Sequence, residues 1–137
     1  MTVDTSISSE QRPKGSPDQK VAHGVVRGHV VIAVKLLRER MAEPWTLSGL
    51  AAEVHLSRSQ LARAFATTVG DSPMAYLRRM RVAQMAQLLA STDLSVAGVA
   101  RSVGWTDPNY ASRCFHAAYS LSPTAFRHRQ SPPPPVQ

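Results

Sequence analysis

Cysteine is nearly absent from the 137-residue chain, in which Cys114 is the single one. One thiol can form neither an internal disulfide nor a zinc cage, so we exclude a disulfide-stapled secreted scaffold and a structural zinc module. Long apolar runs are also missing: the longest is Val30 to Val34, whereas a membrane span needs roughly 20 residues. The polar N-terminus lacks the apolar core of a signal peptide. We therefore expect a soluble, cytoplasmic protein with no membrane partner.

Acidic residues and lysines are scarce too. The chain has 16 Lys and Arg against 9 Asp and Glu, a net charge of +7. Residues 1–20 carry three charges of each sign, so the excess lies in the rest of the chain. Thirteen of the basic residues are arginines, whose planar side chain makes paired hydrogen bonds with phosphates and guanine edges. This composition favours a polyanion as partner, with a merely solubilising surface as the alternative.

Motifs for catalysis, metals and cofactors are missing. The sequence has no H-E-x-x-H, no C-x-x-C and no glycine-rich phosphate loop. Cys114 and His116 lie two positions apart on a predicted helix, so they point to different faces. The other histidines are scattered: His23, His29, His55 and His128. We therefore predict no enzyme, no metal site and no cofactor.

The two ends of the chain lack any apolar period. Residues 1–20 are rich in Ser, Pro, Gln and Asp, and residues 131–137 read SPPPPVQ, so both are expected to be disordered tails around a domain at 21–130. An amphipathic helix that ends before Pro44 is predicted near the start of that domain. Its apolar face is formed by Val26, Val30, Ala33, Val34, Leu37 and Met41.

From Trp45 onward the chain repeats itself once. The offset is 49 residues in the first part of the repeat and 50 in the second. The matching pairs are Thr46 with Ser95, Val54 with Val103, Arg63 with Arg113, Phe65 with Phe115, and Ser72-Pro73 with Ser122-Pro123. Two copies are too few for a solenoid, so we interpret the repeat as a duplicated small helical unit.

Each copy predicts two helices joined by a tight turn, at 46–70 and at 95–119, with a linker helix at 73–90 between them. Good N-cap residues stand where the four short helices start: Thr46, Ser57, Ser95 and Asp107. No convincing strand alternation occurs. We therefore predict an all-α fold with two helix-turn-helix subdomains joined by a central linker helix.

The turns have the residues that a helix-turn-helix needs. Gln60 completes a capping box with Ser57, and Gly70 suits the C-terminus of that helix. Gly104 can adopt a positive φ in the second turn. Its counterpart in the first copy is His55, which tolerates that conformation better than most residues do.

These segments resemble the C-terminal DNA-binding region of AraC/XylS-type bacterial transcription regulators, from about His29 to Arg129. The matching stretches are LAAEVHLSRSQLARAF (50–65), VGDSPMAYLRRMRV (69–82), LLASTDLSVAGVARSVGW (88–105) and SRCF with SLSPTAFRHR (112–129). The resemblance implies about seven helices, two helix-turn-helix units and a linker helix beginning near Pro73. It also implies a sequence-specific activator or repressor in the cytoplasm, on the nucleoid, that contacts promoter DNA and often RNA polymerase.

The sequence departs from the family pattern at six positions. Gly49 and Gly98 stand where the glutamate of a capping box is usual, which weakens both scaffold helices slightly. Glycine is usual where His55 and Ser120 stand, and alanine where Met85 stands. Phenylalanine or leucine is usual at Ala111, so the second core needs extra volume there. The candidates to fill it are Trp105, Tyr110 and Cys114.

The resemblance also places the DNA contacts on the second helix of each unit. Arginine suits guanine, asparagine suits adenine, and a helix N-terminus suits a phosphate. The predicted contacts are Ser57, Arg58, Ser59, Ala62, Arg63, Thr106, Pro108, Asn109, Tyr110 and Arg113. Ser57 and Thr106 are expected to be caps first and phosphate contacts second, and Arg63 and Arg113 have a buried ion pair as their alternative role. On the linker helix we expect a solvated face at Arg78, Arg79 and Arg81, with phosphate contact as the alternative.

Two further alternatives stay open at this point. The chain has no room for an effector-binding barrel, so it resembles either the stand-alone Mar/Sox/Rob group or the DNA-binding part of a longer regulator with an N-terminal sensor domain. A linker helix of about 27 Å would let a monomer read two successive major grooves, about 34 Å apart, over about 20 base pairs. The rival function is a protein-interaction module or antagonist that keeps the fold and binds DNA weakly.

Overall fold

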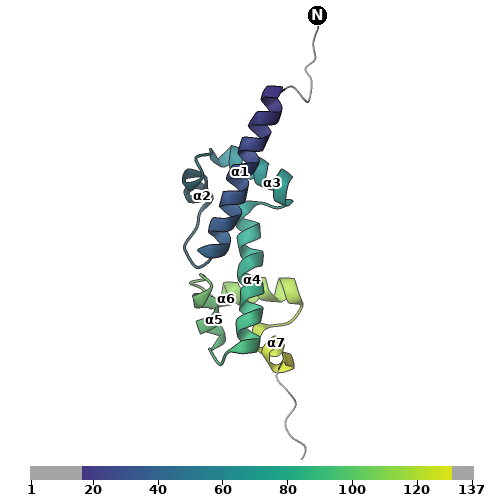
Figure 1. Ribbon diagram of the computed structural model, residues 1–137. Coiled ribbons are helices and arrows are strands. Elements are labelled where there is room, and N and C mark those ends of the chain that lie inside the picture. Colours follow the sequence, from purple (N-terminus) through teal and green to yellow (C-terminus); the bar gives the residue numbers. More distant parts are fainter. Residues whose placement is uncertain (1–16, 131–137) are drawn as a thin grey trace, which may run out of the picture.

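The computed structural model describes residues 17–130, with side chains from residue 25 onward. This part of the chain contains seven α-helices and no strand (Figure 1). The helices are α1 (Pro17–Glu39), α2 (Leu47–Glu53), α3 (Arg58–Val69), α4 (Pro73–Ser91), α5 (Val96–Ser102), α6 (Pro108–Tyr119) and α7 (Pro123–Gln130). The all-α prediction is confirmed.

Helix α1 begins earlier than expected. The tail expected at 1–20 overlaps the helix from Pro17 to residue 20, since proline is a favoured first residue of a helix and an acidic residue suits its first turn. Residues 1–16 and the proline-rich segment at 131–137 lie outside the described residues, so the tail predictions there are not tested.

Side-chain caps fix the helix starts. The Thr46 hydroxyl accepts a hydrogen bond from the Gly49 N–H, and Ser95 does the same for Gly98. Ser57 and Gln60 form the expected capping box, with distances of 2.9 and 3.1 Å. The caps were predictable because each bond joins residues only two or three positions apart.

The repeat extends to the backbone conformation. Positive φ values occur at His55 (60°) and Gly104 (109°) in the two turns, and at Gly70 (88°) and Ser120 (60°) after the second helix of each unit. The sequence offsets of 49 and 50 residues therefore join positions of the same left-handed geometry. Residues other than glycine are strained there by contact of Cβ with the backbone.

Replacing Ser120 by glycine is expected to raise the free energy of unfolding by about 0.5–1 kcal/mol, because φ is already 60° and the side chain is exposed. Urea unfolding of both proteins would measure the change. Ala66→Gly, at an exposed site inside α3, is the matched control and should lower stability by about 1 kcal/mol. A loss of stability in Ser120→Gly would contradict the strained cap.

Two apolar cores lie along the molecule, and α4 contributes to both. The first, between α1, α2, α3 and the start of α4, is centred on Phe65, whose ring meets Tyr76 at 5.6 Å. The second, between the rest of α4 and α5, α6 and α7, is centred on Phe115, which meets Phe126 at 5.3 Å. Met41 packs against both cores. One continuous helix thus forms a wall of each unit, as Figure 1 shows, and restrains their relative orientation.

Two of the three candidates to fill the volume at Ala111 lie in or against the second core. Ala111 is fully buried, Trp105 is part of the second core, and Cys114 packs against it. Tyr110 is 40% exposed and meets only the edge of the core, through a T-shaped contact with Trp105 at 6.4 Å. Of the three alternatives, Tyr110 is therefore the one that lies outside the core.

Arg81 corrects a second expectation. Instead of belonging to a solvated face, its side chain is buried in the junction between the two units. Its Nε donates to the Met41 carbonyl at 3.0 Å and its Nη2 to the Glu43 carbonyl at 2.8 Å. The guanidinium also lies 5.9 Å from the Trp105 ring centre. Burial lowers the pKa of Arg81 from its ordinary value, yet an arginine stays charged in proteins.

Candidate nucleic-acid interface

Helix α3 presents a polar face built by its amphipathic period. Leu61 and Phe65 are fully buried and Ala64 packs against the first core, so the opposite side of the helix faces outward. Arg58, Ser59 and Arg63 are exposed, as is the capping residue Ser57, while Ala62 is half-buried. Helix α1 packs against α3. It also contacts the end of α2, where the His29 ring Nδ1 lies 2.5 Å from the Val54 carbonyl.

Helix α6 presents the equivalent face in the second unit. Ala111 and Phe115 are fully buried, whereas Asn109, Tyr110 and Arg113 are exposed and Pro108 is half-buried. The Arg113 guanidinium lies 5.7 Å from the Tyr110 ring centre, and that ring in turn touches Trp105. Arg113 is thus partly held in place by stacking, whereas Arg63 has no ring beneath it in the described part.

The helix N-termini differ between the two units. Ser57 acts as the cap of α3, as expected. The cap of α6 is Asp107, which accepts from the Asn109 N–H at 2.9 Å, so Thr106 lies before the cap and its prediction as a cap was wrong. An aspartate at this position places a negative charge where a phosphate would otherwise approach, and Thr106 is exposed beside it.

The arginines fall into groups by their contacts. Arg79 pairs with Asp71 at 2.8 Å, and Arg40 pairs with Glu43 at 2.6 Å. Arg81 and Arg127 donate to backbone carbonyls, the latter to Leu89 at 3.0 Å. Among residues 25–130, no acidic side chain pairs with the remaining arginines, which are Arg27, Arg38, Arg58, Arg63, Arg78, Arg101, Arg113 and Arg129.

The alternative role expected for Arg63 and Arg113 does not hold. Both side chains are exposed and neither has an acidic partner in the described part of the chain, so neither is in a buried ion pair. Each is a free cationic donor on the outward face of its helix. Such donors, beside small or polar neighbours, suit the base edges and phosphates of nucleic acid.

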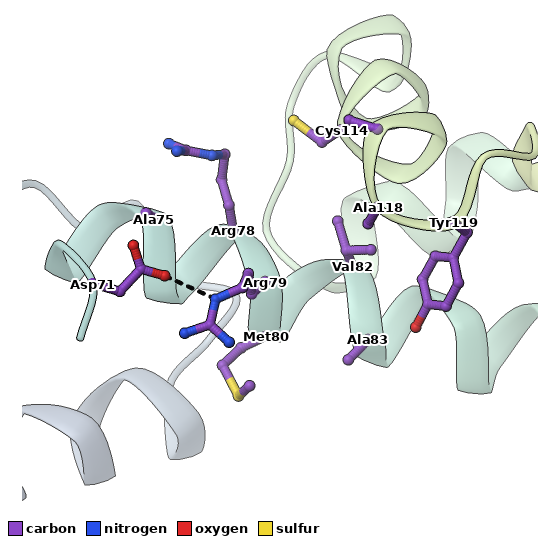
Figure 2. A pocket seen from close by; sticks show the side chains of 11 residues that line it. Asp71, Ala75, Arg78, Arg79, Met80, Val82, Ala83, Cys114, Ala118 and Tyr119 are labelled. Atoms are coloured by element: carbon purple, nitrogen blue, oxygen red, sulfur yellow. Dashed lines mark hydrogen bonds and ion pairs between the residues drawn. The ribbon is translucent and has the colours of Figure 1, made fainter. Parts of the chain in front are cut away.

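A shallow groove of about 690 Å³ separates α4 from the later turns of α6 (Figure 2). Arg78 and the Asp71–Arg79 ion pair lie on its α4 side, and Cys114 and Tyr119 lie on its α6 side. The floor is apolar, and the thiol has no histidine among the lining residues. The groove therefore does not pair the Cys114 thiol, as a nucleophile, with a histidine that could act as its general base.

Metal ligands do not cluster either: within the described residues, no group of three His, Cys, Asp or Glu side chains could hold an ion. In the same part of the chain, no helix is both long enough and apolar enough to cross a lipid bilayer.

Comparison with known proteins agrees with this geometry. A family described as "Helix-turn-helix domain" matches residues 50–129, more than half of the chain. A solved transcriptional regulator from Chromobacterium violaceum, described as having an AraC-type DNA-binding domain, superposes with a TM-score of 0.70 at 25% identity over 79% of this chain and 96% of that one. The chain belongs to the AraC-type helix-turn-helix family.

Two further similar proteins are a solved DNA-binding domain and a curated transcriptional regulator. The DNA-binding domain of AdpA, a global transcriptional factor solved in complex with a target DNA, is 30% identical with a TM-score of 0.71, over 73% of this chain and 90% of that chain. The transcriptional regulator MtrA of Neisseria gonorrhoeae is 30% identical over 83% of this chain and 35% of its own length. The chain thus spans about a third of the length of the curated relatives it matches.

Proposed function

We propose that this chain is a sequence-specific transcription regulator that places α3 and α6 in successive major grooves of promoter DNA. The observation that carries the proposal is the pair of exposed, arginine-bearing faces on α3 and α6, joined by one helix. In the view of Figure 1, α2 and α5 lie on one side of the central column of helices, and the later turns of α3 and of α6 emerge on the other side.

The spacing supports binding by a single copy of the chain. Helix α4 has 19 residues, which is about 28 Å at 1.5 Å per residue, and successive major grooves on one face of DNA are about 34 Å apart. The buried Arg81 junction and the shared wall of the two cores restrain the units. A monomer then covers about 20 base pairs of an asymmetric site.

The residue roles follow from the exposed donors. Arg63 reads bases in the first block, while Arg58 and Ser57 hold the adjoining backbone. Asn109 and Arg113 read bases in the second block, with Tyr110 and Pro108 packed against the groove and Thr106 next to the backbone. The small side chains of Ser59 and Ala62 leave room for thymine methyl groups.

Beyond DNA we propose two partners. RNA polymerase is the first, because regulators of the AraC type act on promoters, where the polymerase also binds. A sensor domain N-terminal to α1 is the second, because the matched segments make up only 28% and 35% of the lengths of two of the relatives. We also propose that the protein acts in the bacterial cytoplasm, associated with the nucleoid. The described residues have no catalytic grouping, which favours a role without enzymatic activity.

The proposal is tested by selecting bound sequences from a random duplex pool near physiological salt, then titrating the winner and a scrambled duplex. We expect two conserved blocks about ten base pairs apart, bound at least about a thousandfold more tightly than scrambled DNA. A log K that falls steeply against log salt, by about 0.9 per phosphate contact, should accompany it. No enrichment by the folded protein, or a shallow salt slope, would favour the protein-interaction module instead.

A further inference from the structure

A second cleft lies between α1 and the recognition helix α3, on the flank of the first unit. Its volume is about 400 Å³, and its walls include Arg27 from α1 and Gln60, Arg63 and Thr68 from α3. Arg27 and Arg63 are 36 positions apart in the sequence, and only the packing of α1 on α3 brings them to one cavity. Neither helix alone would form it.

The chemistry of the cleft is that of an anion site. Arg27 and Arg63 line it, and both are exposed and without an acidic partner in the described part of the chain. Among the residues whose side chains the structure describes, none that lines the cleft is acidic. The Gln60 amide oxygen accepts the Ser57 N–H, so its amide nitrogen is left as a donor. Two like charges facing one cavity repel each other, and an anion between them converts that repulsion into attraction.

The position of the cleft indicates which anion it takes. Arg63 belongs both to the cleft and to the outward face of α3, so the cleft opens at the edge of the surface that meets DNA. When a recognition helix lies in a major groove, the sugar-phosphate backbone runs along each of its flanks. Here α1 forms one flank, and Arg27 projects from it.

We infer that the cleft between α1 and α3 holds one phosphodiester group of the bound DNA, with Arg27 as its principal ligand and Gln60 as a second donor. This inference rests on the proposed function, and it adds α1 to the DNA-binding surface. The positive charge of Arg63 attracts the same phosphate, while its guanidinium nitrogens donate hydrogen bonds to the base edges.

The test uses Arg27→Gln in the full chain, with the selected duplex and a scrambled one. We expect binding of both duplexes to weaken about three- to tenfold near physiological salt. The slope of log K against log salt, called the salt slope below, should become shallower by about 0.9, the value of one phosphate contact. The affinity ratio of the two duplexes should not change, because a phosphate carries no sequence information. Arg27→Lys should restore most of the slope, since the positive charge is kept.

Arg38→Gln is the matched control, because Arg38 lies on the same helix, is exposed and unpaired, and lines a different hollow beside α5. Its salt slope should equal that of the unchanged protein. If Arg27→Gln keeps the full slope, or if Arg38→Gln loses as much, the cleft is not a phosphate site although the proposed function stands. If the unchanged protein selects no duplex at all, both the proposed function and this inference fail.

Discussion

Gly104→Ala is expected to lower the free energy of unfolding by about 2–4 kcal/mol, because it combines backbone strain with overpacking. The φ of Gly104 is +109°, which a residue with a Cβ rarely adopts. An added Cβ would lie 2.7 Å from the Arg81 Nη2 and 2.9 Å from the Ala42 Cα. Arg81 cannot swing aside without breaking its bonds to the Met41 and Glu43 carbonyls.

The chain offers a matched control in Gly70→Ala. Gly70 also has a positive φ, of 88°, but nothing lies within 4 Å of an added Cβ. This variant should lose only the conformational part, about 1–2 kcal/mol. Urea unfolding of the two variants and the unchanged protein gives both values. Equal losses in the two variants would mean that the close approach at the Arg81 junction adds nothing.

The second large effect concerns DNA. Arg63→Ala and Arg113→Ala are each expected to weaken binding of the selected duplex by about 1–3 kcal/mol, or roughly 5- to 150-fold, if each makes a bidentate base contact. The double variant should lose the sum, about 2–6 kcal/mol, because the two arginines lie on different units and share no partner. Titration by fluorescence anisotropy measures all three.

The two variants are also expected to lose base discrimination in different blocks of the DNA site. Arg63→Ala should relax discrimination only in the first block of the site, and Arg113→Ala only in the second. Arg101→Ala, which removes an exposed arginine from the scaffold helix α5, is the control and should change affinity little. Unchanged binding by both Arg63→Ala and Arg113→Ala would overturn the assignment of these residues.

Local features of the fold could be predicted from the sequence. The caps at Thr46, Ser57 and Ser95 act within three residues, so the sequence around each of them suffices. The left-handed conformation of His55 followed from its match with Gly104 in the repeat. The outward faces of α3 and α6 followed from the helical period, although the role of each residue on them is still a proposal.

Features that depend on tertiary packing could not be predicted in this way. Arg81 looked like one of three solvent-facing arginines, but the carbonyls that bind it lie 38 and 40 positions away in the sequence. The pairing of Arg27 with Arg63 in one cleft likewise depends on how α1 packs on α3. A helical period shows which side of a helix faces inward. It does not show which other helix or loop packs beside that helix.

The central claim is that the two helix-turn-helix units of one chain bind two blocks of the same DNA site at the same time, in a fixed relative orientation. It is tested most directly by inserting five base pairs, about half a helical turn, between the two blocks of the selected duplex and titrating the protein against both duplexes. We expect the insertion to rotate the second block away from α6 and to weaken binding at least about a hundredfold, to the level that one unit alone provides. Equal binding of the two duplexes would contradict the claim, because the units would then either move independently or not both read DNA.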